Sequence, residues 1–553
     1  MLPVVSLTLF LPLAGAVLIL ALPRPTARTV HSIGIGTAGL TLVGALAMWL
    51  EGVSGAGFSQ VEELEWIPAI GAAYRVGVDG ISLPLVLLSA MLFLVAFIYA
   101  SSLRERPRAY VALVLLLETA AIGTFTALDG ILFYVFFEVS LVSMYFMIAG
   151  WGHEDRQRAA LMFFIYTLLG SLPLLLAILG LYLGSPDPTF DMRAWIANPP
   201  LEGAAAMWAL IAMLITFAVK IPAIPLHTWL PAAHVQAPTV GSVILAGIML
   251  KFGTYGLGRF ALQMTPDALR DAGIVVLFFG VVSAIYGAFA ALAQTDLKRL
   301  VAYTSISHMG FVIIGIYAGN ETALQGAVIQ MLAHGLSTGA LFVLCGELYE
   351  RIHTRELAKM GGLAKRLPAF ASFLMFFCVA SLGLPGTGNF LGEFLVLLGA
   401  FQVVPVLTVI AAIGLVAGAI YSLLIIQRAL HGPARDQAPL VDLNGREQFM
   451  MVAMVLLLLA LGLYPQPVID AAHQPLAAMV AQPVIPSHHL YSTPAWNRPI
   501  RPETRMVSAA SPVRSLRKGT AKDRSASAIA AKWGQRCHQH ISHGCIPKTY
   551  SEI

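Results

Sequence analysis

Residues 207–230 read MWALIAMLITFAVKIPAIPLHTWL, and residues 243–260 read VILAGIMLKFGTYGLGRF. Both stretches are apolar and long enough to cross a bilayer as a helix, yet each holds one lysine, Lys220 or Lys251. A lysine at the middle of a bilayer costs about 2.5–3.5 kcal/mol on insertion scales. A chain does not keep two such amines without a polar path around them, so transport of a charged species is the first hypothesis.

The composition is that of a protein that crosses a membrane many times. Of its 553 residues 58% are apolar and only 11% are charged, and the mean hydropathy is +0.78. Backbone groups in lipid must be hydrogen-bonded within each segment, and the alternation of a membrane barrel is absent. We therefore predict an all-α polytopic membrane protein with about fourteen transmembrane helices. They cover residues 3–22, 32–50, 82–101, 109–128, 131–149, 161–183, 204–222, 238–259, 273–293, 300–319, 324–347, 368–387, 404–427 and 448–466.

The basic residues between these helices predict how the chain is oriented, because Lys and Arg mark loops on the inner side of a membrane. The odd-numbered connections hold 17 Lys and Arg residues, and the even-numbered connections hold 4. The acidic segment EGVSGAGFSQVEELEW (51–66) lies in an even connection. We therefore expect the N-terminus outside and the odd connections inside.

The C-terminal tail differs from the rest of the chain. Residues 498–553 carry a net charge of +8, whereas the whole chain carries +5. The tail is rich in Ser, Pro, Arg and Ala without an apolar helical face, which is typical of disorder. Its run CHQHISHGC (537–545) could be drawn as a zinc ligand set, but nothing around it would support one. We expect no metal and interpret the tail as an unselected extension.

The prolines after Lys220 predict a broken helix. Pro222 and Pro225 remove amide donors, so the helix should open there. Broken helices in transporters lie along the ion path, although a lysine that snorkels at a helix end is the alternative. Glu138 lies near the middle of its own predicted helix. Paired with a lysine it would be ionised and could exchange protons; the alternative is a neutral structural carboxyl.

The second half repeats this arrangement. The stretch ASLGLPGTGNFLGEFLVLL (380–398) contains Pro385 and Gly386, a second predicted break, followed by Glu393. His308 and His334 lie within predicted helices, and an imidazole relays protons well near neutral pH. A histidine that is simply hydrogen-bonded is the alternative for each. A break in each half suggests an internal duplication.

The sequence lacks the motifs of several classes of nucleotide-binding proteins and hydrolases. The chain has no G-x-x-x-x-G-K-[ST] phosphate loop, no dinucleotide-binding glycine fingerprint, no GxSxG elbow and no HExxH pair. It therefore shows no means of using ATP or NADH itself. Energy for pumping would have to come from a partner or an ion gradient.

Several of these stretches resemble a known family. Residues 219–260, VKIPAIPLHTWLPAAHVQAPTVGSVILAGIMLKFGTYGLGRF, resemble the central signature of the antiporter-like membrane subunits of the proton-translocating NADH:quinone oxidoreductase, respiratory complex I. Over residues 70–465 the chain looks like the chain M family, in which Glu393 stands where sister chains commonly carry Lys. The segments that carry this likeness are GVDGISLPLVLLSA (77–90), FFEVSLVSMYFMIAGWG (136–152), DLKRLVAYTSISHMGFVIIGIY (296–317), LAHGLSTGALFVLCGELYER (332–351) and GLPGTGNFLGEF (383–394).

The resemblance implies a domain plan and roles for the buried polar groups. It implies fourteen helices with two inverted five-helix repeats, each holding a broken helix. Glu138 and Lys220 would be the coupled pair of the first half-channel, and Lys251 the central relay. His308 and His334 would link to Glu393, the proton group on the exit side. The expected parts are residues 1–105 (N-terminal helices and outer loop), 106–260 and 261–430 (the repeats), 431–475 (C-terminal helix) and 476–553 (tail).

The resemblance also implies the protein's surroundings. The chain would be a translocase subunit without a redox site or cofactor of its own, while NAD, FMN, iron–sulfur clusters and quinone would belong to partner subunits. Its partners would be other membrane subunits, especially chains L and N, together with lipid and protons but no nucleic acid. It would lie in the inner membrane of a bacterium.

Two alternatives and two departures from the family remain. The chain could instead serve a multisubunit cation/proton antiporter or membrane hydrogenase, or act only as a structural scaffold. The family usually reads PDAH where this chain has Ala232, and it commonly has a proline where this chain has Ser143. Neither departure removes a member of the proposed relay.

Overall fold

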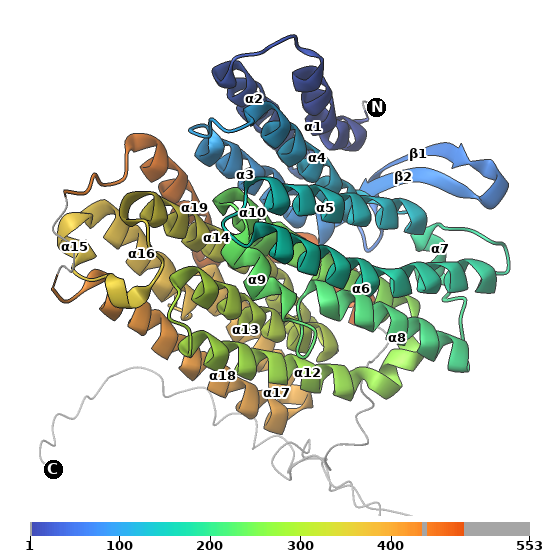
Figure 1. Ribbon diagram of the computed structural model, residues 1–553. Helices are drawn as coiled ribbons and strands as arrows, with labels where there is room; N and C mark the ends of the chain where they lie inside the picture. Colours follow the sequence, from blue (N-terminus) through green and yellow to red (C-terminus); the bar gives the residue numbers. More distant parts are fainter. Residues whose placement is uncertain (1–2, 434–438, 481–553) are drawn as a thin grey trace, which may run out of the picture. The chain divides into compact units, whose positions relative to one another are not determined.

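The computed structural model describes residues 3–433 and 439–480, and that part of the chain is mostly helical (Figure 1). Thirteen helices within those ranges are long and apolar enough to cross a membrane, which confirms a multi-pass membrane protein. They are α1 (Val4–Ala21), α2 (Ala27–Glu51), α3 (Ser82–Ala100), α4 (Pro107–Thr126), α5 (Gly130–Trp151), α6 (Arg156–Gly184), α8 (Gly203–Lys220), the composite helix Thr239–Leu262, α12 (Pro266–Leu292), α13 (Leu297–Tyr317), α14 (Glu321–Ile352), α18 (Pro405–Ile425) with its last turn η5 (Ile426–Leu430), and α19 (Gly445–Leu463).

Two further features interrupt the helices where the sequence predicts breaks. After α8 the chain turns irregularly until α9 (Trp229–Gln236) begins. The range predicted as one helix over 368–387 is instead α16 (Pro368–Ser381), a break, and α17 (Gly388–Val403). Gly383 and Gly386 in this break have φ of +92° and +93°, a left-handed conformation that a helix cannot contain. The predicted range was therefore wrong. It ended near the break, and the second half-helix, α17, was not predicted.

The composite helix that carries Lys251 is α-helical only in parts. It consists of α10 (Thr239–Ile244), the π-helical turn η2 (Leu245–Met249), α11 (Leu250–Gly256) and a second π-helical segment, η3 (Leu257–Leu262). π-Helical turns are rare and often occur at functional sites. Apart from Thr239 and Gly258, every residue of the composite helix is buried, so its other polar groups face protein and not lipid.

The outer connection after α2 contains a β-hairpin that the sequence analysis missed. Strand β1 (Ser59–Ile67) pairs antiparallel with β2 (Ala72–Val78) through a short turn, η1 (Pro68–Ile70). Arg75 on β2 forms ion pairs with Glu63 (2.5 Å) and Asp129 (2.9 Å). The hydrogen bond from Arg75 lowers the pKa of Glu63 below its usual value. Hydropathy alone could not reveal this hairpin, because its strands are short and half exposed.

The remaining elements are short or terminal. Helix α20 (Gln466–Val480) continues five residues past the predicted start of the tail at residue 476, with Leu476 and Met479 buried. The tail from residue 481 onward, including the CHQHISHGC run, lies outside the described residues. Cys345 and Cys378 are free and buried, as core residues should be. The short helices are α7 (Met192–Ala197), η4 (Leu357–Lys359) and α15 (Leu363–Arg366).

The connections gather at two ends as the charge pattern predicts. Among the odd connections, the Trp151 indole donates to Glu105 O at 2.9 Å, and Leu297 N donates to Arg355 O at 2.9 Å. Among the even connections, bridges join residue 76 to 127 and residue 129 to 191. In these contacts odd connections lie beside odd connections and even connections beside even connections, as expected if the two sets lie at opposite ends of the helices.

A buried ion pair ties the start of α3 to the composite helix. Asp79 (1% exposed) pairs with Arg259 (2% exposed), which also donates from Nε to the Tyr255 hydroxyl at 3.2 Å. Removing one partner of such a pair leaves an uncompensated buried charge.

We therefore expect Asp79→Asn to destabilise the chain by about 3–5 kcal/mol. The matched control is Asp267→Asn, since Asp267 pairs with Arg270 at an exposed site and should cost about 0–1 kcal/mol. The measurement is the temperature at which the chain aggregates in detergent-solubilised membranes. Equal shifts in both variants would contradict the structural role of the buried pair.

Candidate functional site

Lys220 is the last residue of α8, and it is only 3% exposed. Its Nζ lies 4.3 Å from the ring centre of Phe137 and 5.7 Å from that of Phe252, and aromatic faces attract cations. No group in the described ranges forms a hydrogen bond with this Nζ. Burial of this kind does not fit a lysine that snorkels to a headgroup layer. It fits an amine that is enclosed at the helix break.

The break itself is stabilised by groups around it. Ala223 N donates to Ala218 O at 2.7 Å, and the indole of Trp229 donates to Val219 O at 2.9 Å. The carbonyls that Pro222 leaves without their usual donors are thus satisfied. The end of α8 is therefore a defined part of the fold that fixes the position of Lys220.

Glu138 on α5 faces the same region but does not touch Lys220. The residue is only partly buried, and its Oε1 has no partner in the described chain. The charges of Glu138 and Lys220 interact electrostatically. The two side chains share no hydrogen bond in the described chain, and Lys220 lies over the ring of Phe137, the residue before Glu138.

Lys251 and His334 are in direct contact. The fully buried Nζ of Lys251 lies 2.7 Å from Nδ1 of His334 and donates to the Ala246 carbonyl at 2.7 Å. That carbonyl belongs to the π-helical turn η2, in which the ordinary i to i−4 pattern is displaced. An ammonium donates to Nδ1 when the proton of the neutral imidazole is on Nε2, and this Nε2 has no partner among the described residues.

His308 and Glu393 form the second contact. Nδ1 of His308 lies 2.7 Å from Oε1 of Glu393, which also accepts a hydrogen bond from the Gln330 amide at 2.9 Å. The other ring nitrogen lies 3.1 Å from the Ser381 hydroxyl. A Cβ on Gly392 would lie 2.7 Å from Gln330 N, so only glycine permits this approach of α17 to α14.

The two contacts lie close to each other. The rings of His308 and His334 have their centres 5.6 Å apart, so one polar row runs from Lys251 to Glu393. Lys220 and Lys251 are not joined by a hydrogen bond within the residues described, and the Phe252 ring faces Lys220. The structure thus places the six predicted residues in two groups, Glu138 with Lys220 and the other four together.

Some buried polar residues were not found from the sequence. Glu118 on α4 is fully buried, and neither carboxylate oxygen has a partner in the part of the chain described. A charge within the apolar run 109–128 was the signal for it, the same signal that identified Glu138. Gln330 and Ser381 gave no signal, because neutral polar residues are common in buried helices.

This arrangement can pass protons. Carboxylate, amine and imidazole groups each bind and release one proton, and the contacts near 2.7 Å are short enough for direct transfer. No three metal-ligating side chains converge anywhere in residues 3–433 and 439–480. Buried ionisable groups in membrane helices typically mark an ion or proton pathway.

Comparison with known proteins places the chain in a family. A family model described as "NADH:quinone oxidoreductase/Mrp antiporter, TM" matches residues 127–420. NADH-quinone oxidoreductase subunit M of Escherichia coli (strain K12) is 44% identical over 485 residues, covering 84% of this chain and 95% of that protein. Subunit M of Pseudomonas aeruginosa is 48% identical over 416 residues, covering 73% and 82%. A chain of respiratory complex I from Thermus thermophilus has a TM-score of 0.79 at 34% identity, covering 86% of this chain and 98% of that chain.

The discontinuous helices and the buried polar row define an antiporter-like membrane protein. Within this class, two relatives that are 44% and 48% identical to the chain are both subunit M of NADH-quinone oxidoreductase. The chain belongs to the subunit M family of NADH-quinone oxidoreductase, respiratory complex I. The resemblance seen in the sequence is confirmed, and the matching family model also covers Mrp antiporter subunits.

Proposed function

We propose that this chain moves protons across the membrane along its buried polar row, driven by redox chemistry in partner subunits. The observation that carries the proposal is the pair of contacts, Lys251 with His334 and His308 with Glu393. A proton leaving the Lys251 ammonium has an acceptor at Nδ1 of His334. The Glu393 carboxylate likewise has an imidazole N–H beside it.

The charges of the groups favour protons over a metal cation. Sodium and other hard cations are bound by several oxygen ligands, whereas the row from Lys251 to Glu393 consists of one amine, two imidazoles and one carboxylate. A protonated Lys220 or Lys251 would repel a metal cation entering the same path. Membership in a class that includes Mrp antiporters keeps sodium as the second candidate.

The experiment uses the purified complex in liposomes with NADH, a soluble quinone and a pH-sensitive dye. We expect the lumen to acidify in a sodium-free medium. Sodium-22 uptake without acidification would contradict the choice of ion. Acidification that is unchanged when the chain is absent would contradict any role of this chain in translocation.

Membership in the family supports a proposal for the partners and the setting as well. NAD, FMN, iron–sulfur clusters and quinone are assigned to other subunits, and this chain supplies no redox site. Its neighbours in the membrane are other complex I subunits, with chains L and N as the expected contacts. The bacterial relatives favour the inner membrane.

Glu138 offers a graded test of the first half-channel. We expect Glu138→Gln to lower NADH-driven proton uptake at least tenfold, because an amide cannot exchange a proton. Glu138→Asp should stay within about threefold, since it keeps the carboxyl group. Uptake is measured in inverted membrane vesicles and normalised to NADH oxidation by an artificial acceptor. Equal uptake by the Gln variant and the unmodified chain would mean that Glu138 is structural.

A further inference from the structure

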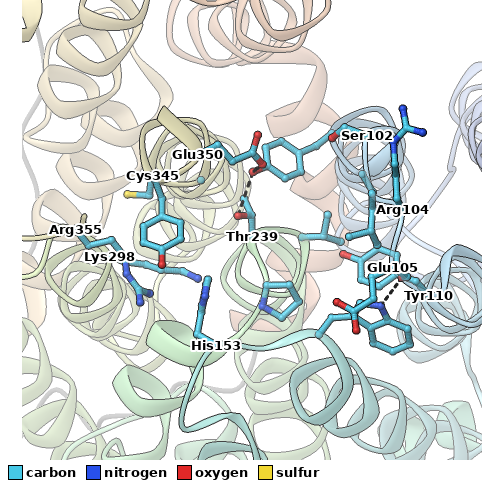
Figure 2. A pocket seen from close by; sticks show the side chains of 18 residues that line it. Ser102, Arg104, Glu105, Tyr110, His153, Thr239, Lys298, Cys345, Glu350 and Arg355 are labelled. Atoms are coloured by element: carbon cyan, nitrogen blue, oxygen red, sulfur yellow. Dashed lines mark hydrogen bonds between the residues drawn. The ribbon is translucent and has the colours of Figure 1, made fainter. Parts of the chain in front are cut away.

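A large polar cavity lies among the odd connections, at the end of the molecule predicted to face the cell interior. Its volume is about 580 Å³, within the range of roughly 300–1,000 Å³ that is typical of ligand pockets. Figure 2 shows Lys298 and Arg355 near His153 on one side of it, and Arg104 with Glu105 on the other. None of the six predicted relay residues lines this cavity, so it needs a separate explanation.

Two cations in the cavity wall are held by the end of the half-helix α9 and keep unused donors. Nζ of Lys298, a residue that is 4% exposed, donates to Ala237 O at 2.7 Å, and Nη1 of Arg355 donates to Val235 O at 2.6 Å. The peptide dipoles of α9 favour cations at this end. Each carbonyl takes one donor, whereas an ammonium has three N–H donors and a guanidinium has five. Both side chains therefore keep donors for a bound group.

The acidic side chains of the cavity wall are engaged with other partners. Glu105 pairs with Arg106 at 3.2 Å, and Glu350 accepts a hydrogen bond from the Tyr99 hydroxyl at 2.9 Å. Figure 2 shows Glu105 across the cavity from Lys298. These carboxylates therefore do not neutralise the cations on the opposite wall.

The two cations create a positive field that is only partly compensated. Arg355 has one long ion pair, at 3.8 Å to Asp296, and no carboxylate in the described ranges pairs with Lys298. Burial, followed by the charges of Lys298 and Arg355, lowers the pKa of His153 to about 4. Surroundings that disfavour a positive charge on this ring favour a negative charge beside it. The cavity is therefore suited to an anion.

The position of the cavity indicates which anion it binds. Its walls include the inner ends of the membrane-spanning helices α3, α4, α5 and α14. Tyr110, Trp151 and Tyr349 line it, and Tyr and Trp side chains gather at the depth of the lipid headgroups. The abundant anion at that depth is the phosphate group of a phospholipid. Lys and Arg bind phosphate through strong, charge-assisted hydrogen bonds.

We propose that this cavity binds the phosphate group of a phospholipid from the inner side of the membrane, with Lys298 and Arg355 as its donors. The proposal does not depend on the proposed function, because it concerns a bound lipid and not the path of a proton. A headgroup bound here joins the connections after α3, α5 and α14. Its loss should therefore make the chain less stable within the complex.

The first test measures the lipid that stays on the chain when the complex is purified in mild detergent and the chain is released for native mass spectrometry. We expect adducts of phospholipid mass on the unmodified chain, and a bound fraction lower by about threefold or more for Lys298→Gln and for Arg355→Gln. Arg355 is partly exposed, so its variant tests the site without emptying a buried position.

Two controls accompany these variants. Lys298→Arg keeps the charge and should retain the lipid, which separates lost binding from a disturbed fold. Lys359→Gln changes a lysine that is 63% exposed, pairs with Glu356 and lies outside the cavity, and it should also retain the lipid. Equal adducts on the unmodified chain and on all these variants would mean that the lipid is adventitious, and would overturn the proposal.

The second test distinguishes a lipid from a soluble phosphate compound. The complex is stripped of lipid by further detergent washing and then heated with a phospholipid, with diacylglycerol of the same acyl chains, or with glycerol phosphate. The temperature at which this chain aggregates should rise with phospholipid alone, and it should rise less in the Arg355→Gln complex. Equal protection by diacylglycerol would show that the phosphate is not recognised. Protection by glycerol phosphate would assign the cavity to a soluble ligand, and either result would overturn the proposal.

Discussion

Replacement of Lys220 by alanine is expected to abolish NADH-driven proton uptake, with a loss of about 10²-fold or more, while the complex still assembles. Lys220 ends α8 beside Phe137, and no other amine lies at this break in the described chain. Without it, Glu138 has no nearby cation to set its proton affinity. The measurement is dye quenching in inverted vesicles, with NADH oxidation by an artificial acceptor as the measure of assembly.

Lys220→Arg is the matched control for this variant. Arginine keeps the positive charge and the contact with Phe137 but cannot be deprotonated in proteins. If Lys220 exchanges protons, Lys220→Arg should fail almost as completely as Lys220→Ala. Restored pumping in the arginine variant would show that Lys220 supplies only a fixed charge.

The second large effect is expected at Glu393. Glu393→Gln should lower proton uptake by about 10²-fold, because the His308 N–H would then face an amide that cannot take up its proton. Gln330 can still hydrogen-bond the new side chain, so the packing of α17 against α14 should persist. The same vesicle assay measures the effect.

Gln330→Leu is the control for Glu393→Gln. It removes a hydrogen bond to the carboxylate but leaves His308 and Glu393 in contact. We expect its uptake to remain within about threefold of the unmodified chain. If Gln330→Leu fails as completely as Glu393→Gln, then the arrangement of this cluster, and not proton exchange at Glu393, explains the loss.

The breaks and the buried ionisable groups could be predicted from the sequence. A proline, a glycine or a charged residue within an apolar run is unfavourable in a membrane helix, and it can be recognised without knowing the contacts between helices. Lys220 beside Pro222 and Glu393 after Pro385 are anomalies in apolar runs, and the structure contains both breaks. Contacts between helices cannot be recognised from the sequence in this way. The contact of Lys251 with His334 joins residues 83 positions apart and depends on a π-helical turn that has no clear sequence signature.

The omissions have physical reasons as well. Glu118 was detectable, since a carboxylate in an apolar span is as costly as Glu138, and it was overlooked because no helix break accompanies it. The β-hairpin before α3 was missed because hydropathy does not detect short outer strands.

The most direct test of a proton path through this chain is a density map of the intact complex in lipid that resolves ordered water. The account predicts water molecules that bridge Glu138 to Lys220 and Lys220 to Lys251, continuing the contacts seen from His334 to Glu393. A dry, closely packed apolar barrier between Lys220 and Lys251, or amines turned outward to lipid headgroups, would contradict it.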